Sequence, residues 1–168
     1  MSREDVLDRV LLSHYFEEMF STSTGRIDRL LSFLSLFIGS SIVADTGSPV
    51  WSGISIAMIS ALQMTFQFGK SSEHSRKQAK QHQVLFTTAF KLSDDELFNK
   101  MLEIEDGDFE PWAILHNPAM LRTRIHLSVA HDQHEQRLNL IERITARIAG
   151  GPSKRPRAYQ PDSKKPTL

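Results

Sequence analysis

Two long apolar stretches dominate the pattern of hydrophobic and polar residues along the chain. They read LLSFLSLFIGSSIVA, from residue 30, and VWSGISIAMISALQMTFQF, from residue 50, and residues 45–49 join them. No Lys, Arg, Asp or Glu lies between Arg29 and Asp45 or between Asp45 and Lys70. A membrane-spanning helix needs about 17–25 mostly apolar residues, a length that residues 27–44 barely reach and residues 46–69 reach comfortably. The pattern predicts a transmembrane helical hairpin over residues 26–69 with a short outer loop.

A water-soluble helical hairpin is the alternative interpretation, because serines and glutamines recur in both stretches. A soluble helix keeps one charged face, however, and neither stretch has such a face. Summed over its Leu, Ile, Phe and Val residues, insertion of the first stretch gains about 3 to 5 kcal/mol. The second stretch has fewer of these residues and two glutamines, so it is the weaker span. The membrane interpretation is therefore favoured.

Residues 1–25 predict an amphipathic helix that packs on protein. Ser2 is placed to cap this helix, with Asp5 three positions later. Apolar residues at steps of three and four form one stripe: Val6, Leu7, Val10, Leu11, Tyr15, Met19 and Phe20. The polar face carries both signs of charge, unlike the Lys-rich face of a helix that lies on a membrane. Residues 21–25 (STSTG) are expected to break the helix and form a hinge before the first span.

Residues 70–150 predict a cytoplasmic helical region. The second span is expected to continue as a helical stalk to about residue 92, because nothing in that segment breaks a helix. Ser93 and Glu96 form a capping box that starts the next helix, and Asn117 with Pro118 starts a last helix that ends at residues 150–151. Residues 151–168 are Pro-rich and basic and predict a disordered tail. The expected fold is all-α: a two-helix transmembrane hairpin with a cytoplasmic helical stalk and a small helical bundle.

Composition and charge sharpen this prediction. The 168 residues include no cysteine, which excludes disulfides, thiolate metal sites and cysteine nucleophiles and fits a reducing cytoplasm. The 20 basic and 20 acidic residues cancel overall, but basic residues gather on both flanks of the hairpin. The predicted membrane-surface residues are Arg26, Arg29, Lys70, Arg76, Lys77 and Lys80. An excess of Lys and Arg marks the cytoplasmic side, so both termini are expected there.

Small and polar residues inside the hairpin are the candidate functional positions. Small residues four apart allow close helix packing in lipid, and they are Ser35 and Gly39 in the first span and Gly53, Ala57 and Ala61 in the second. Chance produces the same pattern in many apolar helices. Ser60, Gln63 and Gln67 are candidates for lining a pore or contacting another subunit, since polar groups at that depth prefer protein or water to lipid. The alternative is that they bond between the two helices of one hairpin.

The remaining polar clusters indicate no catalytic or metal chemistry. The acidic residues 105–110 lack the twelve-position pattern of a calcium loop, which favours a solvated turn. His131 and His134 share a helix face without the HExxH arrangement, which favours a solvated face over a zinc site. No phosphate-binding glycine loop or nucleophile elbow is present, and His116 beside Asn117 is typical of a core or capping residue. We therefore expect no cofactor, no metal and no enzymatic activity.

Two stretches resemble the SLATT group, bacterial two-transmembrane effectors found beside nucleotide-signalling and other conflict systems. The first comprises residues 62–68 (LQMTFQF), Lys70, residues 73–76 (EHSR) and residues 81–82 (QH). The second comprises residues 103–112 (EIEDGDFEPW) and 115–118 (LHNP). The resemblance covers residues 26–125, although the first span is shorter than usual in that group and the last helix and tail have no counterpart.

The resemblance implies an oligomeric pore in the bacterial inner membrane that damages its own cell when a partner sensor detects phage or a nucleotide signal. The expected partners are then the lipid bilayer, further copies of the chain and a cytoplasmic sensor or signalling protein, with no specific nucleic acid. The alternative function is a membrane-anchored adaptor whose cytoplasmic helices recruit a partner without forming a pore. Ion conduction by the full-length protein distinguishes them: the pore conducts ions and the adaptor does not.

Overall fold

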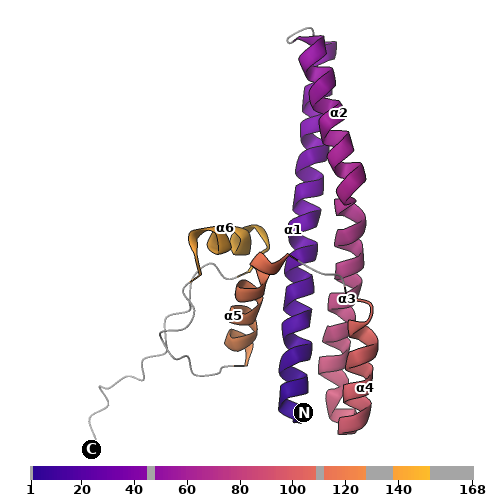
Figure 1. Cartoon of the computed structure of the whole chain (residues 1–168), viewed down its shortest axis with the longest axis vertical. Helices are drawn as coiled ribbons and strands as arrows, with labels where there is room; N and C mark the ends of the chain where they lie inside the picture. Colours follow the sequence, from indigo (N-terminus) through magenta and orange to yellow (C-terminus); the bar gives the residue numbers. More distant parts are fainter. Residues whose placement is uncertain (1, 45–47, 109–111, 128–137, 152–168) are drawn as a thin grey trace, which may run out of the picture.

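The computed structural model describes residues 2–44, 48–108, 112–127 and 138–151, and within these ranges the chain is helical without strands (Figure 1). The helices are α1 (Arg3–Val43), α2 (Pro49–Phe66), α3 (Phe68–Thr88), α4 (Asp94–Glu105), α5 (His116–His126) and α6 (Leu140–Ile148). Two short 3₁₀ turns, η1 (Ala89–Lys91) and η2 (Ala113–Leu115), precede α4 and α5. The all-α prediction is confirmed for this part of the chain.

Helix α1 is the axis of the molecule. Its 41 residues extend about 60 Å, and α2 pairs with its upper half while α3 pairs with its lower half (Figure 1). Helix α4 packs beside α3, and α5 and α6 lie on the other side of α1. The N-terminus is therefore at the end of the molecule opposite the α1–α2 turn, and both α5 and α6 lie below the upper half.

The hydrophobic core lies in the lower half, in two clusters on either side of α1. One cluster joins α1 to η2, α5 and α6: Leu11, Tyr15, Met19, Phe20, Leu115, Ala119, Ala146 and Ala149. The other joins α1 to α3 and α4: Val6, Val10, Leu85, Ala89, Leu97 and Met101. The N-terminal apolar stripe thus packs on protein, as its mixed charge predicts, and the Ser2–Asp5 capping box is formed.

The predicted hinge at residues 21–25 is wrong, because α1 passes through this segment without a break. Thr24 Oγ1 donates to the carbonyl oxygens of Phe20 (2.8 Å) and Ser21 (3.2 Å), so its hydroxyl bonds to the helix that it was expected to disrupt. Ser72 Oγ also donates to the Ser21 carbonyl, at 2.8 Å. A Cβ at Gly25 would lie 2.8 Å from Ser72 Oγ. The small residues therefore mark a close contact between α1 and α3.

The predicted helical stalk after the second span is present as α3, but the helix is interrupted between the two, at Gln67. Helix α2 ends at Phe66, and Gln67 takes a left-handed conformation with φ 45° and ψ 45° before α3 begins. The Gln67 N–H still bonds to the Gln63 carbonyl (2.9 Å), and the Ser71 N–H bonds to the Gln67 carbonyl (3.0 Å). Because the backbone bonds are kept on both sides, the chain bends here without unravelling (Figure 1).

The two predicted helix starts in the C-terminal half have different outcomes. The start at Ser93 is confirmed, and the backbone N–H and hydroxyl of Ser93 bond to the Glu96 carboxylate, which lowers the pKa of Glu96. The prediction of one helix from Pro118 to residue 149 is wrong, because α5 ends at His126 and α6 begins afresh at Leu140.

Asn117 lies in the first turn of α5 and donates to Glu142 Oε1 of α6 at 2.8 Å, so it joins two helices instead of capping one. The predicted stop after residue 149 is confirmed by the positive φ of Gly150. His131, His134 and the tail from residue 152 lie outside the described residues.

Candidate functional site

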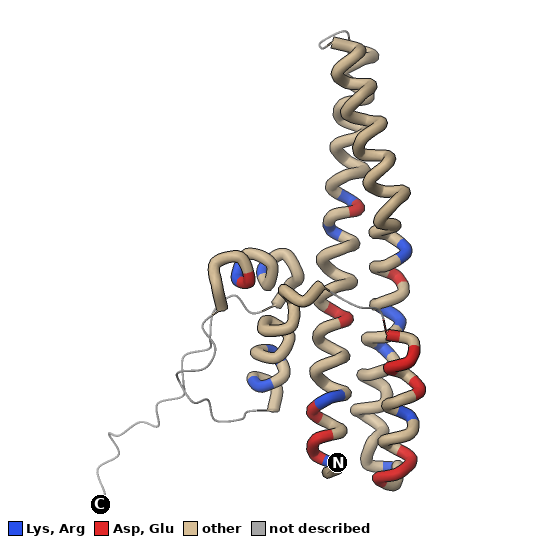
Figure 2. Tube along the Cα trace, viewed as in Figure 1, with Lys and Arg blue, Asp and Glu red and all other residues tan. Residues whose placement is uncertain are grey.

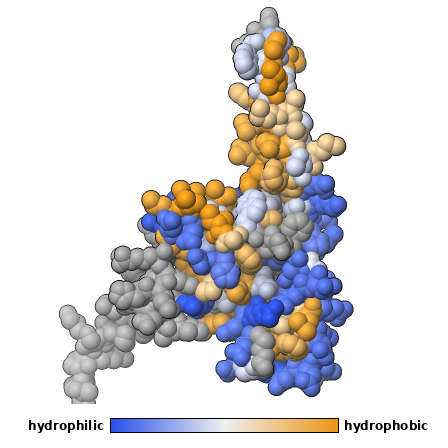
Figure 3. Space-filling view, in the orientation of Figure 1, coloured by the Kyte–Doolittle hydropathy of each residue, from blue (hydrophilic) through white to orange (hydrophobic). Residues whose placement is uncertain are grey.

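The upper half of the molecule exposes its large apolar side chains. None of residues 30–44 and 48–66 is buried. Among them the exposed side chains are Leu30, Phe33, Leu34, Leu36, Phe37, Val43, Val50, Trp51, Ile54, Met58, Leu62, Met64 and Phe66. Figure 3 shows hydrophobic residues over this part of the surface and hydrophilic residues over the lower half. An exposed apolar surface of this extent marks a site of contact with a membrane or another protein.

The contact between α1 and α2 combines one hydrogen bond between side chains with small residues and partly covered aliphatic residues, among them Ile38, Ile56 and Ile59. Gln63 Nε2 donates to Ser32 Oγ at 3.1 Å, and a Cβ at Gly39 would lie 4.0 Å from Ile56 Cδ1. Ser40 Oγ donates to the Leu36 carbonyl within α1 at 2.8 Å. The hairpin therefore differs from a water-soluble pair of helices in one respect: its large apolar side chains are exposed, and Gln63 bonds to Ser32 across it.

The predicted set of Ser60, Gln63 and Gln67 is divided by this geometry. Gln63 faces α1, whereas Ser60 and Gln67 are exposed. At about 100° per residue, Ser60 and Gln67 share one exposed flank of α2 with Gly53 and Ala57. The other flank carries large side chains, namely Trp51, Ile54, Met58, Leu62 and Phe66. Helix α2 thus presents a flank of mostly small residues, on which Met64 and Val50 are the larger side chains, beside a flank of large apolar ones; we name them the small flank and the large flank.

The predicted helix-packing residues are divided in the same way. Ser35 and Gly39 of α1 are partly covered, and Gly39 approaches α2. Gly53, Ala57 and Ala61 of α2 are exposed, and a Cβ at Gly53 would meet no atom within 4 Å. The small residues of α1 therefore serve the contact within one chain, and those of α2 are not used by it.

Only one helix in the described part of the chain is long and apolar enough, by length and composition, to cross a membrane. It is Pro49–Lys91, taken as continuous through the bend at Gln67, and its most apolar stretch is not buried. Helix α1 falls short because its uncharged part, residues 30–43, extends only about 21 Å, whereas the hydrocarbon core is about 30 Å thick. The structure thus supports one candidate span, and the two-helix transmembrane hairpin is not established by it.

Basic residues collect directly below the apolar half, where Lys, Arg, Asp and Glu first appear on α1 and α3 (Figure 2). Arg26, Arg29 and Arg76 line a pocket of about 360 Å³ together with Ser72 and Glu18. Glu18 forms an ion pair with Arg122 at 2.9 Å, so the acidic group of this pocket is already compensated. The pocket is consequently a basic site at the base of the hairpin.

The other predicted membrane-surface residues lie on α3. Lys70 is exposed immediately after the bend, and Lys77 pairs with Glu73 at 2.9 Å, where its hydrogen bond lowers the pKa of Glu73. Lys77 and Lys80 line a second pocket, of about 660 Å³, with Lys100 of α4. These two lysines therefore belong to the groove between α3 and α4 instead of the base of the hairpin.

Histidine contacts that the sequence did not predict hold the acidic turn after α4. The His82 side chain is fully buried, and its Nε2 lies 3.0 Å from both carboxylate oxygens of Asp108. His74 Nε2 lies 2.9 Å from the Gly107 carbonyl, and Arg9 binds both oxygens of Glu105 at 2.6 and 2.7 Å. The expectation of a solvated turn is therefore wrong at Glu105 and Asp108. These contacts join residues 26 to 96 positions apart in the sequence, so no local sequence pattern predicts them.

No group of three or more potential metal ligands occurs within the described residues. The chain matches no protein-family model, no curated protein and no solved structure. The resemblance to the SLATT group consequently stays a prediction that depends on the residues quoted for it.

Proposed function

We propose that the protein is a membrane effector: its α1–α2 hairpin inserts into the bacterial inner membrane, copies associate there, and the assembly permeabilises the bilayer. The observation that carries this proposal is the exposed apolar surface of the hairpin, within which Gln63 bonds to Ser32 of the facing helix. A bilayer selects this arrangement because it offers no hydrogen-bond partners to polar groups and no penalty to apolar ones.

Energetics support insertion of both helices together. Ten exposed Leu, Ile, Phe and Val side chains of the hairpin gain about 3 to 6 kcal/mol in total when they enter hydrocarbon. The Gln63–Ser32 bond lowers the cost of bringing the glutamine along. The short uncharged part of α1 fits if the bilayer thins locally and Arg26 and Arg29 extend their side chains to the headgroups.

The position of the basic residues supports an orientation with both termini in the cytoplasm. The basic pocket of Arg26, Arg29 and Arg76 lies at the base of the hairpin, and Lys70 lies just below α2. The described residues on either side of the hairpin, at α1 and at α3 to α6, lie on this same side (Figure 2). Positive charge beside a span is retained on the cytoplasmic face.

The small flank of α2 supports self-association. Gly53, Ala57 and Ser60 allow a second helix to approach closely, and within the bilayer close packing drives helix association. A single hairpin cannot enclose an aqueous path, so permeabilisation requires several copies. In this proposal Ser60 and Gln67 line the contact or the path, and a separate sensor protein supplies the trigger, as the resemblance to the SLATT group implies.

The test is dye release from liposomes that contain the purified full-length protein, together with its mass in detergent. We expect release and a mass of several chains. Ala57→Leu with Ser60→Leu, on the small flank, should reduce the mass to one chain and abolish release. Thr65→Leu is the matched control, because Thr65 is an exposed polar residue on the large flank of the same helix. Equal release by the two variants would contradict the proposed assembly.

A second candidate function is a membrane-anchored adaptor, and the groove between α3 and α4 favours it. This groove carries the apolar residues Val84, Leu85 and Ile104 between three lysines and Glu103, which suits an acidic amphipathic partner. The Gln63–Ser32 bond also removes Gln63 from the residues that could line a pore. A single-chain mass with no dye release from the unmodified protein would favour the adaptor over the effector.

A further inference from the structure

Helix α6 presents an apolar face that the other described residues of the chain do not cover. Leu140, Ile141, Ile144 and Ile148 are 69, 60, 61 and 44 % exposed. At about 100° per residue these four side chains fall on one side of the helix. Ala146, on the opposite side, is fully buried in the cluster that contains Met19 of α1. Helix α6 is therefore packed on the molecule by small residues, and its large aliphatic residues are directed outward.

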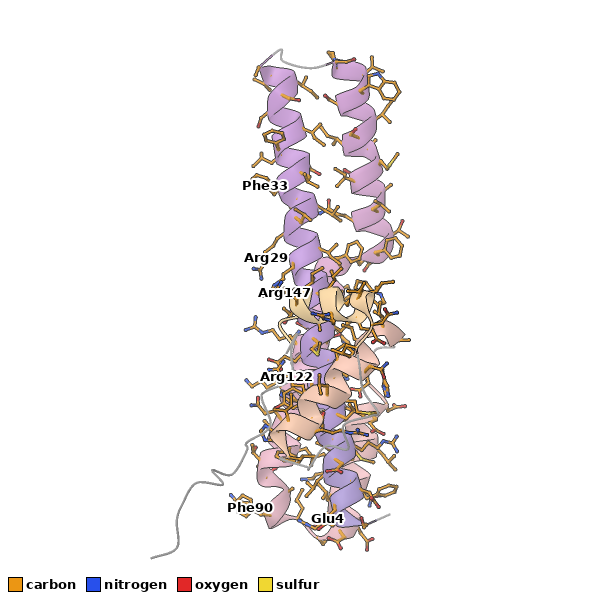
Figure 4. The ribbon with its side chains drawn as sticks, turned by 90° about the vertical axis from the view of Figure 1, so that its left-hand side faces the viewer. Glu4, Arg29, Phe33, Phe90, Arg122 and Arg147 are labelled. Atoms are coloured by element: carbon orange, nitrogen blue, oxygen red, sulfur yellow. The ribbon has the colours of Figure 1, made fainter. Side chains whose placement is uncertain are left out.

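The position of α6 relates this face to the hairpin. The helix lies across the direction of α1, beside the base of the upper half (Figure 1), and hydrophobic residues gather on the edge of this region that faces the hairpin end (Figure 3). Figure 4 places Arg147 just below Arg29 along the long axis, with Phe33 above both. The apolar face of α6 thus lies close to the level at which the apolar surface of the hairpin begins.

A direct bond fixes α6 at this level. Arg26 of α1 donates from Nη1 to the carbonyl oxygens of Ile148 (2.7 Å) and Arg147 (3.3 Å), at the C-terminal end of α6. A cation at this end is favourable, because the last carbonyls of a helix lack partners within it. The same arginine lines the basic pocket at the base of the hairpin. Helix α6 and the start of the apolar hairpin are consequently held together.

The charges around the apolar face of α6 favour an anionic surface. Arg143 and Arg147 are exposed beside it, and Arg29 and Arg76 lie in the neighbouring basic pocket. Glu142, the one acidic residue of α6, is bonded to the Asn117 side chain and to the Asn139 backbone N–H. Guanidinium groups match phosphate in geometry as well as charge.

We infer that α6 is an interfacial helix that seats the helical bundle on the cytoplasmic surface of the bilayer. Its apolar face enters the boundary between headgroups and acyl chains, to a depth of about 5–10 Å, and its arginines bind the phosphates of anionic phospholipids. The inference rests on the proposed function only in that the hairpin occupies the same bilayer. Continuity with the apolar surface of the hairpin and the arginines beside the face favour lipid over a partner protein.

The test uses the absence of cysteine from the chain. Full-length protein carrying Ile144→Cys is labelled with the environment-sensitive probe nitrobenzoxadiazole and reconstituted in vesicles of phosphatidylcholine and phosphatidylglycerol. Nitroxide groups placed high on the acyl chains then quench a probe that lies in the interface. Phe90→Cys is the matched control, because Phe90 is a large exposed apolar residue at the far end of the molecule (Figure 4). Leu36→Cys reports the hairpin.

We expect a blue-shifted and strongly quenched probe at residue 144, and at residue 90 an unshifted probe whose emission the nitroxides leave unchanged. Quenching at residue 36 with none at residue 144 would overturn the inference and leave the proposed function intact. Quenching at neither position would contradict the membrane insertion on which both depend. Capture of the probe at residue 144 by another copy of the chain would give a blue shift without nitroxide quenching, and this result would also overturn the inference.

A second measurement tests the arginines separately. Arg143→Gln with Arg147→Gln keeps the apolar face and the backbone carbonyls that Arg26 binds. We expect the quenching of the probe at residue 144 to decrease in vesicles with phosphatidylglycerol and to stay at its lower level in vesicles of phosphatidylcholine alone. Equal quenching in the two kinds of vesicle for the unmodified arginines would overturn the phosphate-binding part of the inference.

Discussion

The lower and upper halves of α1 belong to one unbroken helix and are built for different surroundings. In the lower half Val10 and Met19 are fully buried, whereas in the upper half Leu36 and Phe37 are 70 and 66 % exposed. Similar apolar residues thus point inward on one half and outward on the other. One continuous helix can therefore have two different environments. The change from buried to exposed apolar residues occurs near Gly25, below the last charged residues of α1.

Electrostatic contacts divide the molecule at the same level. The lower half joins its helices with ion pairs between α1 and its neighbours, such as Arg9 with Glu105 and Glu18 with Arg122. Between residues 30 and 69 the only charged residue in the sequence is Asp45. The lower half is thus held by a buried core and ion pairs, whereas the described residues of the upper half are uncharged and leave their large apolar side chains exposed.

The largest expected effect is a loss of stability in the lower half alone. Leu97 of α4 is fully buried against α1 and α3, so Leu97→Ala leaves a cavity and should lower the free energy of unfolding by about 2–5 kcal/mol. Leu36→Ala, in the exposed upper half, is the control and should leave unfolding of the bundle unchanged. Denaturant titration in mild detergent, followed by circular dichroism, measures both. An equal loss of stability in the two variants would contradict the separation into two environments.

A charge placed on equally exposed residues tests the upper half. Met58 and Phe90 are 62 and 77 % exposed, so in water Met58→Arg and Phe90→Arg should both be tolerated. If α2 lies in hydrocarbon, Met58→Arg costs about 2.5–3.5 kcal/mol of insertion free energy, and Phe90→Arg costs nothing comparable. Extraction of membranes with alkaline carbonate should release the first variant only. Retention of both in the membrane fraction would indicate that α2 is not surrounded by lipid.

The sequence predicts the elements of this structure better than it predicts their junctions. Apolar periodicity and the Ser2 and Ser93 capping boxes are local signals, and the helices that they predict are present. Residues 21–25 read as a helix breaker because the competition of hydroxyl groups for backbone bonds is also a local rule. Residues 21–25 stay helical because they pack against Ser72 of α3, and a local sequence pattern does not contain that contact.

The candidate site was also predicted only in part, because contacts between helices cannot be found from local sequence patterns. Composition located the apolar hairpin and the basic residues at its base, but it could not tell which face of α2 meets α1. Gln63 bonds to Ser32 while Ser60 and Gln67 point outward, a division that depends on the rotation of α2 about its axis. The apolar residues of α6 are visible in the sequence, but their exposure is not, because a single helix was expected over both α5 and α6.

The smallest expected effects come from replacing one glycine in each half of the molecule, Gly25 and Gly53, by valine. In Gly25→Val the new side chain meets Ser72 Oγ, whose bond to the Ser21 carbonyl must then be given up, so we expect a loss of about 1–3 kcal/mol in unfolding free energy.

The same substitution at Gly53 meets no atom of its own chain within 4 Å and should leave that free energy within about 0.5 kcal/mol. If the small flank of α2 is the contact between copies, Gly53→Val should instead lower the mass of the assembly in detergent. Two glycines in one molecule would then serve two kinds of helix contact, within the chain for Gly25 and between chains for Gly53. A Gly53→Val protein that keeps its assembly mass and dye release would remove Gly53 from that contact, because a valine side chain holds two helix backbones apart wherever they touch.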